Sequence, residues 1–191
     1  YVSVVDGKKV AGIWKRDWKE PFVIGKFTTD KTPIIRTSRY FNKDTVVLAV
    51  GQDMTIYRGN ISDSKDRQKE FLQTAKNIKT ENATTSMTLD NAGRFIVAQN
   101  GAALQSYDLE RKELSQVFNI GAAQEVKWLD NFYICSVSAN GKMEIREFDG
   151  TNAHTLLDVK SGMDSVLSAN QRYVYGITVN ASGKFVLNKM N

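Results

Sequence analysis

At residues 89–98 the sequence reads LDNAGRFIVA, and this stretch decides which fold the chain is predicted to have. It opens with a turn, because Asn and Asp side chains bond their own backbone. The aromatic and β-branched residues that follow predict a strand. Asn100-Gly101 then supplies the positive φ of a tight hairpin, and the alternating segment 104–108 predicts the second strand. Residues 89–108 therefore predict a turn followed by a two-stranded hairpin.

The same order of turn, strand, hairpin and strand recurs along the chain. The copies lie at residues 40–57, 129–149 and 168–187, and each carries an asparagine in its first turn. These asparagines are separated by 49, 40 and 39 residues, and they are Asn42, Asn91, Asn131 and Asn170. A period near 40 residues with paired strands inside each unit is typical of a four-stranded propeller blade.

The repeats predict an all-β fold, a β-propeller of four-stranded antiparallel blades, with about four to five blades present. We expect one domain or propeller segment over residues 1–191. Its units are 1–30 (partial), 31–80, 81–121, 122–162 and 163–191 (partial). In the last unit, residues 185–187 are predicted to form the third strand. The alternative is a β-sandwich, because sandwiches also contain short strands at even spacing.

The units resemble WD40 repeats and related propeller repeats, such as those of TolB-like and quinoprotein-like propellers. The resemblance rests on residues 89–97 and on the aromatic–Asp pairs Tyr107-Asp108 and Phe148-Asp149, and it covers most of residues 34–190. No unit has the Gly-His or Trp-Asp dipeptide of WD40 repeats, so the resemblance is to a divergent propeller. It implies a platform for binding, although a fold alone does not assign a function.

Composition excludes several classes of protein. With 191 residues, 41% hydrophobic residues and a net charge of +5, the chain is not of the disordered class. One cysteine excludes an intramolecular disulfide framework and multi-cysteine metal sites. No apolar run approaches the roughly 20 residues of a transmembrane helix. The chain lacks an initiator Met and opens inside an apolar run, which predicts a piece of a longer protein.

Residues for catalysis are scarce. His154 is the one histidine, and Cys135 lies inside an apolar run, so we expect it to be a buried small hydrophobe. The sequence contains no nucleophile elbow, phosphate-binding loop, dinucleotide fingerprint or zinc-binding HExxH motif. We therefore expect no catalytic, cofactor-binding or metal-binding residues, and no cofactor.

Positive charge concentrates near the N-terminus: residues 1–80 carry a net charge of +7 and residues 81–191 a net charge of −2. The basic residues interleave with aromatic ones and predict a patch for an anionic partner, formed by Lys8, Lys9, Lys15, Arg16, Lys19, Lys26 and Trp18. Asp17 and Glu20 interrupt this run, so we do not expect nucleic acid as the partner. The alternative is a solvated strand face with Trp14 packed between blades.

The longest repeat step contains about nine extra residues, which fall within residues 61–80. They predict a rim insertion that carries the charged residues Asp63, Lys65, Arg67 and Lys69. An apolar stripe of helical spacing, formed by Phe71, Leu72, Ala75 and Ile78, predicts a short helix; the alternative is a polar loop leading to an outer strand. Insertions in repeats often lie on the binding face, but long surface loops are also tolerated without a function.

Two functions are compatible with these observations. The first is a non-catalytic propeller domain that binds a protein or a polymer, within a larger surface or envelope protein. The alternative is a segment of a propeller enzyme, hydrolytic or quinoprotein-like, with its catalytic residues in missing blades. We expect an extracytoplasmic or cell-surface location, with the cytoplasm as the alternative. The open strand edges predict a covering by missing blades, by a second copy in a homodimer, or by pairing of residues 1–5 with residues 185–187.

Overall fold

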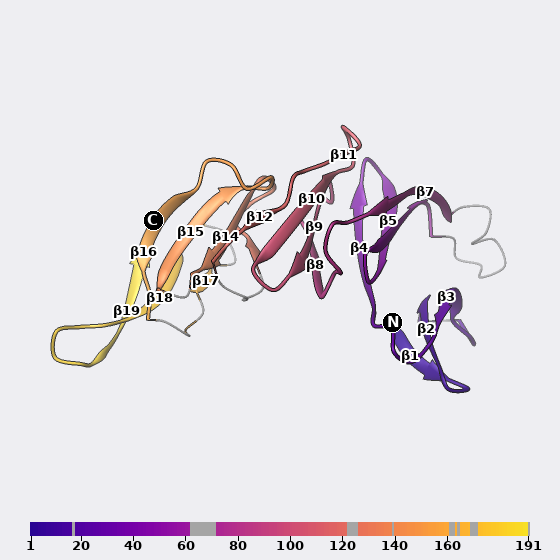
Figure 1. Cartoon of the computed structure of the whole chain (residues 1–191), viewed down its shortest axis with the longest axis horizontal. Helices are drawn as coiled ribbons and strands as arrows, with labels where there is room; N and C mark the ends of the chain where they lie inside the picture. Colours follow the sequence, from indigo (N-terminus) through magenta and orange to yellow (C-terminus); the bar gives the residue numbers. More distant parts are fainter. Residues whose placement is uncertain are drawn as a thin grey trace.

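The computed structural model describes residues 1–16, 18–61, 72–121, 126–138, 140–160, 163, 165–168 and 172–190. Every regular element in these residues is a β-strand, and the strands form five small antiparallel sheets. The sheets follow one another in chain order without exchanging strands. Figure 1 shows them side by side in a row, with the N-terminal sheet at one end and the C-terminal sheet at the other.

The strands of the first two sheets cover residues 2–79. The first sheet contains three strands, which are β1 (Val2–Val5), β2 (Lys8–Ile13) and β3 (Phe22–Phe27). The second sheet contains four strands in sequence order, which are β4 (Pro33–Tyr40), β5 (Lys43–Val50), β6 (Asp53–Gly59) and β7 (Leu72–Lys79).

The remaining three sheets cover residues 86–190. The third sheet contains β8 (Ser86–Leu89), β9 (Phe95–Asn100), β10 (Ala103–Asp108), β11 (Glu113–Leu114) and β12 (Phe118–Asn119). The fourth contains β13 (Lys127–Trp128), β14 (Tyr133–Val137), β15 (Lys142–Glu147) and β16 (His154–Asp158). The fifth contains β17 (Ser165–Leu167), β18 (Val174–Val179) and β19 (Phe185–Met190).

In the third and fourth sheets the repeated turn is held by the aspartate just before the repeated asparagine. The Asp90 carboxylate accepts the Phe95 backbone N–H at 2.7 Å, and Asp130 accepts the Tyr133 N–H at the same distance. In the fifth sheet the Ser168 hydroxyl accepts a backbone N–H at 3.0 Å. The short polar side chain thus closes the turn into the buried strand that follows, as an Asx or Ser turn does.

The second strand of each central sheet is buried along its length. In β5, Val46, Val47 and Ala49 are fully buried, and β9 and β14 have the same pattern. Because successive side chains point to opposite faces, a strand is buried at every position only when both faces of its sheet are covered. Neighbouring sheets provide this cover, so their stacking forms the core.

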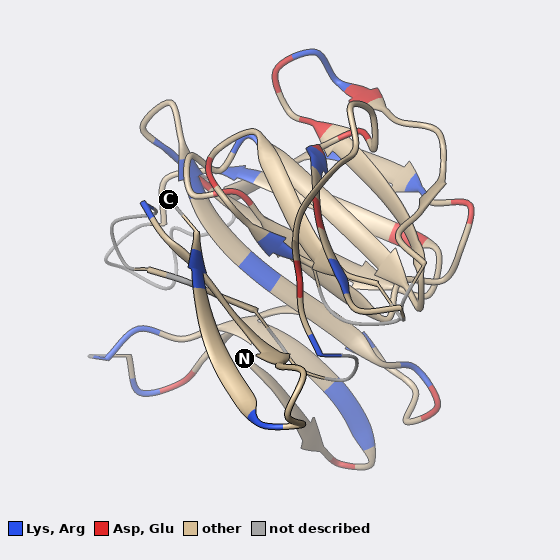
Figure 2. Cartoon of the chain, turned by 90° about the vertical axis from the view of Figure 1, so that its left-hand side faces the viewer, with Lys and Arg blue, Asp and Glu red and all other residues tan. Residues whose placement is uncertain are grey.

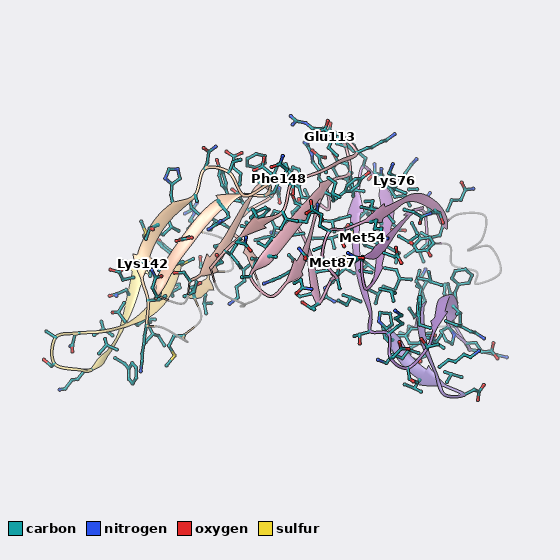
Figure 3. All side chains as sticks on the ribbon, viewed as in Figure 1. Met54, Lys76, Met87, Glu113, Lys142 and Phe148 are labelled. Carbon is teal, nitrogen blue, oxygen red and sulfur yellow. The ribbon has the colours of Figure 1, made fainter. Side chains whose placement is uncertain are left out.

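Three apolar clusters join the second to the fifth sheet. Met54 and Met87 belong to the cluster between the second and third sheets, and Figure 3 shows them close to each other there. Between the third and fourth sheets, the rings of Phe95 and Phe148 stack with their centroids 4.0 Å apart. The cluster between the fourth and fifth sheets contains Cys135, which is 2% exposed as expected.

The helix predicted from the apolar stripe near residue 75 is wrong. Residues 72–79 form β7, which pairs with β6 along its length as the outer strand of the second sheet. This agrees with the alternative of a loop leading to an outer strand. Most of β7 is exposed, so its residues follow the pairing with β6 rather than a helical apolar face. The predicted rim residues Asp63, Lys65, Arg67 and Lys69 lie outside the described residues.

Pairing of residues 1–5 with residues 185–187 within one chain is also not found. Among the described strands, β1 pairs only with β2 and β19 pairs only with β18. The two strands lie at opposite ends of the row (Figure 1). Both carry exposed apolar side chains, including Val4 at 64% and Leu187 at 66%.

The sheet-to-sheet contact at Gly150 yields a test of the stacking. Gly150 has φ +90°, and a Cβ atom placed there would lie 2.3 Å from the Phe118 ring of the third sheet. We expect Gly150→Ala to lower the free energy of unfolding by about 2–4 kcal/mol, from backbone strain and the clash together. Chemical denaturation measures this change.

The matched control is Gly101→Ala, because Gly101 also has positive φ but a Cβ atom at this position would meet no other atom within 4 Å. We expect the control to cost only about 1 kcal/mol from strain. Replacing Phe118 by Ala should remove part of the Gly150→Ala penalty in the double variant. Equal penalties for the two alanine variants would contradict close stacking at this position.

Candidate functional site

The first and second sheets are joined differently from the other neighbouring sheets. Within the described residues, the three buried apolar clusters contain no residue of the first sheet. A concave space of about 740 Å³ opens instead between the end of β2 and strand β4. We call this space the inter-sheet groove; its lining residues come from 12–15 on one wall and 35–38 on the other, with Tyr1, Asp44 and Ile61.

One wall of the inter-sheet groove follows a strand edge, that of β4, whereas on the other wall Gly12 is bonded to Tyr1 on one side and paired with β3 on the other. Successive side chains of a strand point to opposite faces, so four consecutive residues can line one space only along a strand edge. Residues 35–38 of β4 do so. Strand β4 pairs with β5 along its whole length, and no other described strand pairs with its second edge. The groove therefore lies beside an unpaired edge of β4.

The inter-sheet groove has two exposed aromatic residues, Tyr1 and, with the larger exposed fraction, Trp14. The Trp14 side chain is 63% exposed, so the expectation that it packs between blades is wrong. The indole N–H donates to the Trp18 carbonyl at 2.8 Å, which fixes the segment after β2 and holds the ring in place. An aromatic ring that is held in place yet exposed offers a large apolar surface to a partner at low entropic cost.

The charged side chains of the inter-sheet groove are Lys15, Arg36 and Asp44. Arg36 is exposed, and its guanidinium donates to the Ile35 carbonyl at 3.1 Å. The Asp44 carboxylate accepts the Ile61 backbone N–H at 2.7 Å, so this acid already holds a backbone group. Asp44 keeps its negative charge in this hydrogen bond, so the preference for an acidic partner rests on the exposed Arg36 guanidinium.

The predicted basic patch is not one surface in the structure. Lys15 lines the inter-sheet groove, whereas Lys26 lines a second space of about 510 Å³ between the first and second sheets. Lys26 lies opposite Val10, so the neighbouring Lys9 points to the other face of the sheet, where it donates to Thr32 at 3.4 Å. Figure 2 shows basic residues spread over the chain rather than gathered on one face.

The other predicted patch residues lie outside the inter-sheet groove. Lys8, Arg16 and Lys19 are exposed, and Trp18 is half-buried and contributes its carbonyl to Trp14. Conversely, the sequence reasoning missed Arg36. The signal that was available is a charged residue inside the apolar start of β4, but only folding brings it beside Lys15, 21 residues earlier in the chain.

Comparisons with known proteins concern the fold. No protein-family model matches the chain, and no curated protein matches it. Among solved structures, it is similar to the dihydro-heme d1 dehydrogenase NirN in complex with DHE, with a TM-score of 0.61 and 16% identity over 97% of this chain. It is also similar to the C-terminal WD40 domain of Sif2, with a TM-score of 0.55 and 10% identity over 94% of this chain.

A third similar structure is a Bacteroides fragilis protein assigned as a 6-phosphogluconolactonase, with a TM-score of 0.55 and 10% identity over the whole chain. The chain has the fold of a β-propeller. The predicted all-β propeller class is thus confirmed, and the sandwich alternative is wrong, because small sheets in a row replace two facing sheets. The chain spans 42% of the NirN chain, 50% of the Sif2 chain and 68% of the third.

The strand that borders the groove is tied to the next propeller sheet by a charged network. The Tyr40 hydroxyl, at the end of β4, donates to Glu110 at 3.2 Å, and Arg94 lies 2.6 Å from the same carboxylate. Arg94 also donates two hydrogen bonds to Asp108, at 3.1 and 2.6 Å. This network fixes the end of β4 against the third sheet and so fixes one wall of the groove.

Asp108 is 2% exposed, and burial acts to raise the pKa of its carboxyl group. Hydrogen bonds from Arg94 and from the backbone N–H groups of Glu110 and Arg111 outweigh this effect and hold the pKa below 3.8. Asp90 behaves oppositely: burial raises its pKa, and the backbone hydrogen bonds that it accepts only reduce the shift. Both carboxylates hold turns and charges inside the propeller.

Other chemistry-bearing residues of the described part lie apart from one another. The described residues contain no group of three or more His, Cys, Asp or Glu side chains that could hold a metal ion. His154 is exposed at the start of β16, and Cys135 is buried in β14. No helix long and apolar enough to cross a membrane occurs in the described residues.

The Arg94–Asp108 pair makes a pH-dependent prediction. A carboxyl group whose pKa is lowered in the folded state stabilises the fold above its unfolded pKa, and this stabilisation is lost as the pH falls. We expect Asp108→Asn to lower the free energy of unfolding by about 2–3 kcal/mol at neutral pH. The gap between wild type and variant should shrink as the pH falls below 3.8, the ordinary value.

Urea denaturation across this pH range measures the gap, and Glu113→Gln serves as the control because Glu113 is exposed. Asp90 is present in every variant, so its opposite contribution cancels in each comparison. A gap that stays constant down to strongly acidic pH would contradict the role given to the Asp108 carboxylate.

Proposed function

We propose that the chain is a non-catalytic β-propeller binding domain that holds a protein partner in the inter-sheet groove. The observation that carries the proposal is that the exposed Trp14 ring and the exposed Arg36 line one concave space along the unpaired edge of β4. Trp and Arg are the residue types that contribute most often to the energy of protein interfaces.

The form of the groove supports binding. It is bordered by the Trp14 ring on one wall and by the backbone edge of β4 with Arg36 on the other. A partner can bury apolar surface on Trp14 and place a carboxylate near Arg36 at the same time. The WD40 domain of Sif2 is similar to this chain in fold alone.

We also propose that the domain is part of a larger surface or envelope protein and acts outside the cytoplasm. The Asn-, Ser- and Thr-rich composition with two prolines suits this placement, and one buried cysteine without a disulfide suits the cytoplasm equally well, so the cytoplasm stays the alternative. An anionic polymer is the second kind of partner that the exposed Arg36 accommodates.

Selection of binders tests the function directly. A displayed library of random peptides is panned against the immobilised chain, and each selected peptide is titrated against wild type, Trp14→Ala and Arg36→Ser. We expect both substitutions to weaken binding at least tenfold, because each removes a central contact. Lys142→Ser is the matched control, since Lys142 lies on β15 in the fourth sheet, away from the groove.

Two results would contradict the proposal. In the first, the selected peptides bind wild type and both groove variants equally. In the second, the chain turns over a lactone or a dehydrogenase substrate and one polar substitution abolishes that turnover. Circular dichroism of each variant confirms that the fold is kept.

A further inference from the structure

We propose that the occupant of the inter-sheet groove is an extended acidic peptide segment that pairs its backbone with the unpaired edge of β4. The inference rests on the proposed binding function and specifies its partner. The segment lies between β4 and the end of β2, and it adds a strand to the second sheet, a mode known as β-augmentation.

The edge of β4 supplies the backbone groups. Pro33–Tyr40 is eight residues long and pairs with β5 throughout, while its second edge has no strand partner among the described residues. Residues 35–38 of this edge border the groove, and one backbone group there, the Ile35 carbonyl, already accepts the Arg36 guanidinium at 3.1 Å. At about 3.3 Å per residue, they present roughly 13 Å of edge to a bound peptide. An open edge of this kind is a template for another strand.

The side chains around the groove select the peptide. Arg36 is exposed beside the edge, so a carboxylate side chain next to it is favoured. Asp44 also lines the groove, and its carboxylate, which accepts the Ile61 backbone N–H, keeps its charge and disfavours acidic side chains placed near it. Trp14 offers an apolar surface to the side chains between the acidic ones, which point the other way in an extended peptide.

An anionic polymer without a peptide backbone would use only part of this site. It would pair with Arg36, but it would make no use of the backbone groups of β4 that point away from β5. The combination of backbone edge, aromatic ring and positive charge therefore favours a peptide over a polyphosphate or a polysaccharide.

The experiment uses a fluorescein-labelled peptide of alternating valine and glutamate residues, titrated by fluorescence anisotropy. A second peptide has the same sequence but carries N-methyl groups on alternate backbone nitrogens, which removes strand pairing and keeps the charge. We expect the first peptide to bind and the methylated peptide to bind at least tenfold more weakly. We expect Arg36→Glu to weaken the first peptide at least tenfold.

Lys76→Glu is the matched charge-reversal control, because Lys76 is exposed on β7 and does not line the groove (Figure 3). It should change the affinity less than twofold. Amide hydrogen exchange gives a second readout that does not depend on any substitution: exchange within residues 35–38 should slow when the peptide is bound, while exchange in β16 should not change.

Equal binding of the methylated and unmethylated peptides would overturn strand pairing. So would binding of polyphosphate with the same dependence on Arg36 and no effect of N-methylation, which would identify an anionic-polymer site. If the acidic peptide does not bind while selected partners still depend on Trp14, the inference fails and the binding function stands. Loss of both would reject the two proposals together.

Discussion

The structure depends on one constraint: each central sheet must have both faces covered. Strands β5, β9 and β14 carry apolar residues on both faces, so a single sheet of this sequence would expose one face of every buried strand to water. Stacking in a row removes this surface from water. Neighbouring sheets can approach closely where one of them has a residue without a side chain, such as Gly150 against the Phe118 ring. The turns held by Asp90 and Asp130 set where each buried strand begins, and therefore set the register of the stack.

The groove lies where this covering of sheet faces is incomplete. The first sheet contributes to none of the three apolar clusters in the described residues, so its contact with the second sheet leaves a hollow beside β4. The C-terminal end of β4 is held firmly, because the Tyr40–Glu110–Arg94 contacts tie it to the third sheet. The groove is therefore preorganised for binding: strand β4 is held in place with an unpaired edge, and Trp14 is held by its hydrogen bond while its ring stays exposed.

Much of the fold can be predicted from the sequence because its signals are local. Turn chemistry and apolar runs near residues 90, 130 and 168 repeat along the chain, and they indicate stacked hairpin sheets. The helical stripe through Ala75 misleads, because pairing with β6 overrides local periodicity in a mostly exposed strand. The site is harder to predict. Lys15 was identified from its basic neighbours, but Arg36 joins it only through the packing of the first two sheets, and the exposure of Trp14 depends on the hollow between them.

Residue-resolved amide hydrogen exchange of the free chain tests the central claim most directly. If stacked sheets form one core beside an unpaired strand edge, amides of β5, β9 and β14 should exchange slowly and together, through global unfolding. Within residues 35–38, the amides that point away from β5 should exchange orders of magnitude faster. Slow exchange of all four of these amides, or rapid exchange in β5 and β9, would contradict the account.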